Sequence, residues 1–238
     1  MLLEIAVFNI DSAIVAAASN ADRIELCDNF HDGGTTPSPA TLEIASKRFS
    51  IPVFPMIRPR GGDFFYSDID FQIMLQDILF CKSLGFAGIV TGLLEKNGHV
   101  DAKKLRRLVE AAFPMDVTFH RAFDRAKDPF ESMEKIIDCG CERILTSGQQ
   151  PDANMGRDLI KALIEKAENR ITIMPGSGVR KENILELAQY TGATELHSSA
   201  RKNIPSAMEF IQKEMQESIS NISVDTNEIR EMKKRISV

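Results

Sequence analysis

The sequence predicts an α/β protein that folds as a single (β/α)8 TIM barrel. Short runs of strand-forming residues recur along the chain, and their starts lie about 27 residues apart. Amphipathic stretches with helical spacing lie between these runs, and no Ser/Gly-rich linker divides the chain. A closed barrel needs eight such strand–helix units, whereas an open doubly wound sheet usually has fewer strands. We therefore expect one barrel domain over residues 1–238.

The individual elements follow from local patterns and from helix-end signals. Asp101 precedes one helical stretch, Asp128 and Pro129 precede another, and Gly140 and Gly192 stand where helices should end. The predicted strands are residues 3–8, 23–27, 53–57, 88–91, 117–120, 143–147, 171–175 and 194–198. The clearest predicted helices are residues 69–84, 103–112, 130–137, 159–167 and 184–188.

The C-terminal part, residues 203–238, is expected to hold the last helix and a tail. Residues 206–217 are predicted to form the last helix of the barrel. The charged segment over residues 225–235 is predicted to be a surface helix or a frayed tail.

The composition excludes several classes of protein. There are 29 basic and 34 acidic side chains, which gives a formal net charge of −5, whereas nucleic-acid-binding proteins are normally basic. No apolar run reaches the roughly 18 residues of a membrane helix, and the N-terminal Met-Leu-Leu-Glu has an acid where a signal peptide has bases. The four cysteines are too few and too irregularly spaced for a disulfide framework. We expect a cytoplasmic protein with no nucleic-acid or membrane partner, and a homo-oligomer stays open.

Period-two alternation predicts which strand residues face the inside of the barrel. The residues that it turns inward are Glu4, Arg23, Glu25, Cys27, Thr118, His120, Glu195 and His197. The first, second and eighth strands are neighbours in a closed barrel, so the three glutamates can approach one another, with Arg23 or Arg143 as counter-ions. Such a lumen is either a satisfied ion-pair network or a functional cluster, and both interpretations are kept.

One candidate site is a metal centre. Cys27, His120 and His197 bring a thiol and two imidazoles to one mouth of the barrel, and these ligand types suit zinc or copper. No Cys-x-x-Cys or His-x-x-x-His spacing fixes that geometry, and each histidine can equally donate a hydrogen bond or move a proton. Cys139 and Cys141 form the one close cysteine pair, but they fall at the barrel face that is associated with stability.

A second candidate site binds an anion. The loops at the carboxyl ends of barrel strands hold the active site, and those after strands seven and eight commonly bind phosphate. Arginine suits phosphate or carboxylate. The predicted ligand-binding residues are Arg58, Arg60, Arg121, Asp124, Ser147, Gly176, Gly178, Ser198 and Arg201. If the protein is an enzyme, Glu25 or His120 would move protons. These residues predict an enzyme or sensor for a small phosphorylated or carboxylated metabolite.

Six motifs lie between residues 22 and 201: DRIELC at 22–27, GGTTPS at 33–38, MIRPRGGDF at 56–64, TFHRAFD at 118–124, RILTSGQ at 143–149 and ELHSSAR at 195–201. Together they resemble the CutC family. The resemblance implies a cytoplasmic barrel protein of copper homeostasis that binds copper. It implies that Cys27 is the natural copper ligand and that His120 and His197 assist it. Cys139 and Cys141 stand where the family has ordinary residues, so the resemblance assigns them no copper.

Overall fold

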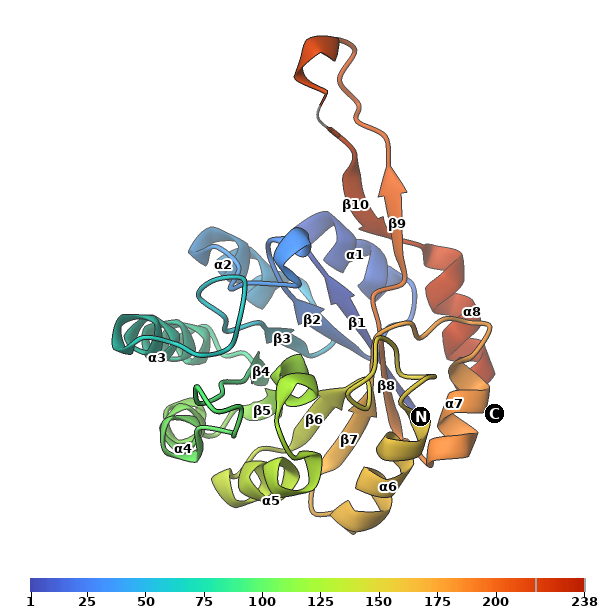
Figure 1. Ribbon diagram of the computed structural model, residues 1–238. Coiled ribbons are helices and arrows are strands. Elements are labelled where there is room, and N and C mark those ends of the chain that lie inside the picture. Colours follow the sequence, from blue (N-terminus) through green and yellow to red (C-terminus); the bar gives the residue numbers. More distant parts are fainter. Residues whose placement is uncertain (217, 238) are drawn as a thin grey trace.

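The computed structural model describes residues 1–216 and 218–237, and it confirms the predicted α/β fold of alternating strands and helices (Figure 1). The barrel strands are β1 (Leu2–Val7), β2 (Arg23–Leu26), β3 (Val53–Pro55), β4 (Gly88–Thr91), β5 (Asp116–Phe119), β6 (Arg143–Thr146), β7 (Thr172–Pro175) and β8 (Glu195–Ser198). The helices around them are α1 (Ile10–Ala18), α2 (Pro39–Arg48), α3 (Asp68–Ser83), α4 (Ala102–Ala112), α5 (Pro129–Cys139), α6 (Arg157–Ala167), α7 (Ile184–Thr191) and α8 (Thr226–Ile236).

The barrel strands run parallel and form two four-stranded sheets, in the orders β3-β2-β1-β8 and β4-β5-β6-β7. A parallel bridge between Met56 and Val90 joins the β3 side to β4, and the Ile57 N–H donates to the Val90 carbonyl at 2.7 Å. On the other side β7 lies beside β8 (Figure 1). The two sheets therefore close around a common lumen, and β1, β2 and β8 are neighbours as predicted.

The helices begin and end at the predicted signals. The side chains of Asp101 and Asp128 accept hydrogen bonds from the first turns of α4 and α5. Helices α5 and α7 end at Gly140 and Gly192, whose φ angles of +89° and +79° lie in the region that favours glycine.

The main apolar core lies between the strands and the surrounding helices. Leu3, Ile5, Ile24, Leu26 and Leu196 alternate along three neighbouring strands and are fully buried in it. The residues between them face the lumen, which confirms the alternation argument. The buried polar residues of these strands are Glu4, Arg23, Glu25, His197 and Ser198.

The segment after β8 differs from the prediction. Strands β9 (Arg201–Ile204) and β10 (Asn221–Val224) pair antiparallel at the base of an arm that projects from the barrel (Figure 1). Residues 206–212 form no helix and only a 3-10 turn, Lys213–Met215, follows, so the helix predicted over 206–217 is wrong; its end, Glu217, lies outside the described residues. The physical reason is that the apolar residues of this segment find no surface to cover, and Phe210 stays 71% exposed.

Helix α8 takes the place of the last barrel helix. Asp225 caps it, and Ile229, Met232 and Ile236 recur at spacings of three and four residues and are buried. This buried stripe explains why the segment predicted as a surface helix or frayed tail is ordered as a helix against α7 and α1. Across the two described ranges, none of the helices has the length and apolar character that a bilayer-spanning segment needs.

Candidate functional site

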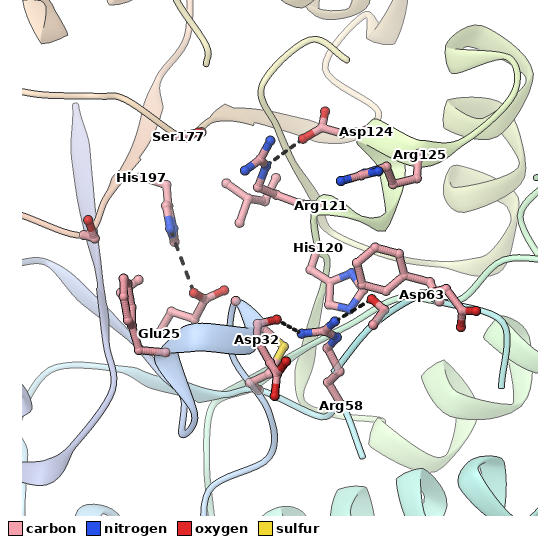
Figure 2. Close-up of a pocket in the computed structure, with 18 of the residues that line it drawn as sticks. Glu25, Asp32, Arg58, Asp63, His120, Arg121, Asp124, Arg125, Ser177 and His197 are labelled. Carbon is pink, nitrogen blue, oxygen red and sulfur yellow. Dashed lines mark hydrogen bonds and ion pairs between the residues drawn. The ribbon is translucent and has the colours of Figure 1, made fainter. Parts of the chain in front are cut away.

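A cavity of about 1380 Å³ opens at the carboxyl ends of the strands, where barrel proteins place their sites (Figure 2). Its floor includes Glu25 and His197, and its walls come from the loops after β1, β2, β3, β4, β5, β7 and β8. Of the predicted site residues, those that line it are Glu25, Arg58, His120, Arg121, Asp124, Gly178, His197, Ser198 and Arg201. Cys27, Arg60, Ser147 and Gly176 are not among the residues that line it.

Below the cavity floor, a chain of ion pairs fills the lumen. Strand register places Glu4 between Arg23 of β2 and His197 of β8. The Arg23 guanidinium bonds to Glu4 and also to Glu195, at 2.6 Å, and Arg143 reaches Glu195 at 3.1 Å. Burial alone would raise the pKa of Glu4, but Arg23 and His197 outweigh it and lower that pKa to about 2. The counter-ions predicted from the alternation are therefore confirmed.

Glu25 has a different environment from Glu4 although both are buried. The pKa of Glu25 is raised to about 7, chiefly by burial; the charge of His197 opposes this shift, and the charge of Glu4 contributes to it. Its Oε2 lies 3.9 Å from His197 Nε2, and its Oε1 has no hydrogen-bond partner among the described residues. Figure 2 shows His197 directed toward Glu25 at one side of the cavity. A carboxyl group with this pKa can exchange a proton near neutral pH.

His197 links the two glutamates. Its Nδ1 lies 2.8 Å from Glu4 Oε1, and its other nitrogen faces Glu25. Burial lowers the pKa of His197, but the two carboxylates outweigh that effect and raise it above its ordinary value. Glu25 and His197 thus form an acid–base pair at the cavity floor.

Cys27 lies behind Glu25 rather than on the cavity wall. Its thiol contacts Glu25 Oε2 at 3.6 Å, and it packs against Gly34. Burial, followed by the charge of Glu25, raises the pKa of the Cys27 thiol well above its usual range. The Cys27 sulfur is therefore a protonated thiol, which is a weaker nucleophile than a thiolate.

His120 lines the opposite side of the cavity. Its Nδ1 accepts a hydrogen bond from the Ala122 N–H at 3.2 Å, and its Nε2 is buried without a partner among the described residues. Burial, with the positive charge of Arg58, lowers the pKa of His120 to about 3. The His120 ring packs tightly against the backbone of Gly92, because a β-carbon on any other residue at position 92 would lie 2.5 Å from Nδ1. His120 is therefore a fixed, neutral imidazole.

Arg58 is buried beside His120 and holds loops together. Its terminal nitrogens donate to the carbonyls of Asp32, Gly34 and Gly62 at 2.5, 2.7 and 2.9 Å. Its guanidinium lies 5.0 Å from the centre of the Phe64 ring, and its Nε has no partner in the described part of the chain. Three of its five N–H donors are thus used by backbone carbonyls, and its buried Nε–H is left without a partner among the described residues.

The other predicted arginines differ in their partners. Arg121 bonds to Asp124 at 2.7 Å and to Ser147 at 2.8 Å, and Asp124 in turn accepts from the Ser147 N–H. Arg60 pairs with Asp63 and Asp70 and stacks on Tyr66, outside the cavity lining. These contacts hold loops in place. Arg60 and Arg121, which the sequence predicted to bind an anionic ligand, are therefore already paired with aspartates.

Three arginines of the cavity form no ion pair with any described residue. They are Arg125 in the loop after β5, Arg180 after β7 and Arg201 after β8. Arg201 lies 4.9 Å from the centre of the Phe30 ring, and Arg125 is exposed at the mouth. Arg125 and Arg180 are not among the predicted ligand-binding residues, although the position of Arg125, four residues after Arg121 in the same loop, was a usable signal.

The loops after β7 and β8 are tied together at the cavity wall. Ser198 Oγ donates to the Val179 carbonyl at 2.7 Å and accepts from the Ala200 N–H. Gly178 has a φ angle of +69°, and a Cβ there would lie 2.8 Å from Asp152. Gly176 packs against Leu145 and His197 behind the wall. These loops therefore form a fixed surface beside His197.

A metal ion has one candidate ligand group in the described ranges. Glu4, Glu25 and His197 place one ligand atom each within 4.8 Å of one another. Cys27 and His120 are not part of this group, so the predicted set of Cys27, His120 and His197 stays a prediction. Two carboxylates and an imidazole suit a borderline divalent ion such as Cu(II), whereas Cu(I) prefers sulfur. Arg23, bonded to Glu4, opposes a further cation there.

Cys139 and Cys141 lie away from this site. Both are buried in the core, Cys139 Sγ contacts the Ala102 carbonyl at 3.4 Å, and all four cysteines are free thiols. The expectation that this pair has a structural place is consistent with their burial at the end of α5 and the start of β6.

Comparison with known proteins identifies relatives that match most of this chain. The CutC family model matches residues 1–202. A human protein named copper homeostasis protein cutC homolog is 46% identical over 209 residues, which is 88% of this chain and 77% of that protein. A crystal structure from Streptococcus agalactiae, described as a candidate copper homeostasis protein CutC, is 36% identical with a TM-score of 0.80 and covers 84% of this chain and 98% of that one. N-(5'-phosphoribosyl)anthranilate isomerase from Pyrococcus furiosus shares the fold at 12% identity, with a TM-score of 0.59 over 100% of this chain and 98% of its own.

Proposed function

This chain belongs to the CutC family, and from that premise we propose that its cavity binds a small phosphorylated or carboxylated metabolite and moves a proton at Glu25 and His197. The anion would enter at the mouth and lie against the loops after β5, β7 and β8. The acid–base pair would act at the floor. Copper homeostasis, the role that the names of the human and streptococcal relatives carry, is the second candidate.

The observation that carries the first proposal is unbalanced charge at the cavity. Arg125, Arg180 and Arg201 line it without an acidic partner among the described residues. Bidentate guanidinium matches phosphate and carboxylate, and Arg125 and Arg201 are exposed where a ligand can reach them. A bound anion would supply the missing partner for all three side chains.

Calorimetric titration with inorganic phosphate and with citrate tests this proposal. Changing Arg125, Arg180 and Arg201 singly to Gln should weaken binding about tenfold each, because each removes a charge-assisted hydrogen bond. Arg170→Gln is the matched control, since Arg170 pairs with Glu134 on the helical surface. Equal affinity in the triple variant and the wild type would overturn the proposal.

Copper is supported by the relatives' names and by the Glu4, Glu25 and His197 group. On this interpretation copper is the cargo that the protein holds. The donor set favours Cu(II), with Glu25 and His197 as the ligands that no arginine occupies. The Cys27 set implied by the family resemblance would instead favour Cu(I).

Competition against chelators for Cu(I) and for Cu(II) separates these ligand sets. If Cys27→Ser weakens Cu(I) binding, the set of Cys27, His120 and His197 is supported. If His197→Gln and Glu25→Gln weaken Cu(II) binding at least tenfold while Cys27→Ser does not, the buried carboxylate set is supported. Copper affinity that none of the three variants changes would exclude a copper site at the cavity floor.

A further inference from the structure

Two buried N–H groups beside the cavity have no acceptor among the described residues. They belong to His120 and Arg58, which are 3% and 4% exposed, and both line the cavity. Both also pack on Phe64, whose ring centre lies 4.9 Å from that of His120 and 5.0 Å from the Arg58 guanidinium carbon. Buried donors normally have partners, so these two indicate a missing acceptor.

The hydrogen bond at His120 decides which nitrogen carries the proton. Nδ1 accepts from the Ala122 N–H, so it cannot be protonated, and the proton of the neutral ring must be on Nε2. The unpartnered atom is therefore a donor. Arg58 Nε always carries a proton, and three N–H groups of the terminal nitrogens are bonded to carbonyls, so the Nε–H donor is also fixed in place.

These donors are held before any ligand arrives. His120 is packed against Gly92, Phe119 and Phe64, and Arg58 is tied to three backbone carbonyls of two loops. Donors that need no rearrangement stabilise negative charge on an oxygen most effectively in a site that excludes water. The pair has the features of a site for a carbonyl oxygen that gains charge during a reaction.

Across the cavity from this pair lies a carboxyl group with a free oxygen. Figure 2 shows His120 and Arg58 together on one side and Glu25 on the other. Glu25 Oε1 is buried without a partner in the described residues. The three side chains that carry an acceptor for a proton and two donors for an oxygen therefore line the same cavity.

We propose that His120 Nε2–H and Arg58 Nε–H bind the carbonyl oxygen of the ligand, and that Glu25 removes a proton from the carbon beside that carbonyl. This inference rests on the proposed function and narrows its ligand to an anionic carbonyl compound, such as a phosphorylated aldehyde or ketone or an oxo acid. It gives His120 the role of a neutral donor.

The chemical step is balanced without any co-reactant. The Glu25 carboxylate takes the proton, the C–H electron pair becomes a C=C bond, and the carbonyl π pair moves to the oxygen. The resulting enolate oxygen accepts the two N–H hydrogen bonds. Return of the proton from Glu25 to the same carbon restores the ligand, with exchange of that hydrogen for one from solvent.

Paired probes test the donor site separately from the anion site. The hydroxamate of phosphoglycolic acid resembles a phosphorylated enediolate, and 2-hydroxyethyl phosphate carries the same phosphate without the acyl oxygen. Malonic monohydroxamate and 3-hydroxypropionate form the matching carboxylate pair. The wild type should bind the hydroxamate of at least one pair about tenfold or more tightly than its partner, because only the hydroxamate fills the donor site.

Variants and a spectroscopic signal assign that preference to His120. His120→Phe keeps the ring volume and should reduce the preference to about twofold or less, while His120→Gln, which keeps an N–H donor, should restore part of it. In the unmodified protein, the Nε2–H proton resonance of His120 should move downfield when the hydroxamate binds.

The outcomes separate the two proposals. If both members of each pair bind equally to the wild type, the donor site is wrong and the anion site stands. A hydroxamate preference that survives in His120→Phe, with no shift of the Nε2–H resonance, also overturns the inference. If none of the probes binds, the proposed function fails together with it.

Discussion

Glu4 and Glu25 lie on adjacent strands, both are buried, and their pKa values are shifted in opposite directions, to about 2 and about 7. Glu4 is bonded by Arg23 and His197, whereas Glu25 keeps one oxygen without a partner among the described residues. The comparison shows that burial alone does not determine a group's role. The number of partners that the neighbouring strands supply decides it.

The two glutamates mark two layers of the same lumen. In the lower layer Arg23 and Arg143 share Glu195, and the polar atoms there have partners. In the upper layer Glu25, Arg58 and His120 line the cavity, and each keeps one buried atom that has no partner in the described part of the chain. A satisfied layer stabilises the fold, and an unsatisfied layer above it is available to a ligand.

Removing the Glu4 carboxylate from the lower layer should change the free energy of unfolding more than the other substitutions do. Glu4→Gln leaves Arg23 with a weaker partner, so we expect the free energy of unfolding at pH 7 to fall by about 3 kcal/mol. Chemical denaturation measures it. The wild-type contribution is present above the unfolded pKa of 4.5 and is lost as the pH falls toward 2, so the difference between the two proteins should shrink in acid. A loss below about 1 kcal/mol at pH 7 would contradict the assignment of Glu4 to a structural layer.

The corresponding substitution in the upper layer, Glu25→Gln, should change the free energy of unfolding in the opposite direction at alkaline pH. The folded protein raises the pKa of Glu25 to about 7, so its stabilising contribution is full below 4.5 and is lost as the pH rises through 7. Glu25→Gln should therefore stabilise the protein at pH 8 by about 2 kcal/mol and change little at pH 4.5. Denaturation curves at both pH values measure the difference. Equal destabilisation at both would show that Glu25 belongs to the satisfied layer.

Arg60 should show the smallest effect, because it lies in neither layer. It is partly exposed, pairs with Asp63 and Asp70, and does not line the cavity. Arg60→Gln should lower the free energy of unfolding by less than about 1 kcal/mol and leave phosphate affinity within about twofold. Titration and denaturation of the same preparation test both statements. A tenfold loss of affinity would return Arg60 to the predicted ligand-binding set.

Strand periodicity was sufficient to predict the fold and the polar lumen. A period of two assigns each strand residue to the core or to the lumen, and strand order then brings Glu4, Glu25 and Glu195 together. The counter-ions Arg23 and Arg143 were predictable because they occupy the same inward positions. These are properties of regular elements, which the sequence pattern specifies directly.

The division of roles at the cavity was not predictable in the same way. Arg58 looks like an anion ligand in the sequence, but the loop carbonyls that occupy its donors depend on turns at Gly34 and Gly62, where φ is +100° and +80°. The two histidines are equivalent in the sequence, yet His197 contacts carboxylates and His120 contacts a backbone N–H. Loop conformation determines such contacts, and residue type alone does not.

The arm between β8 and α8 has a consequence for engineering. The β9–β10 pairing holds the two ends of the arm together at the barrel, and α8 packs on α7 and α1. Lengthening a loop whose ends are already fixed costs little, about 0.6 kcal/mol for each doubling. The tip of the arm is therefore an attachment point at which a fluorescent domain could be inserted while the barrel and its last helix keep their register.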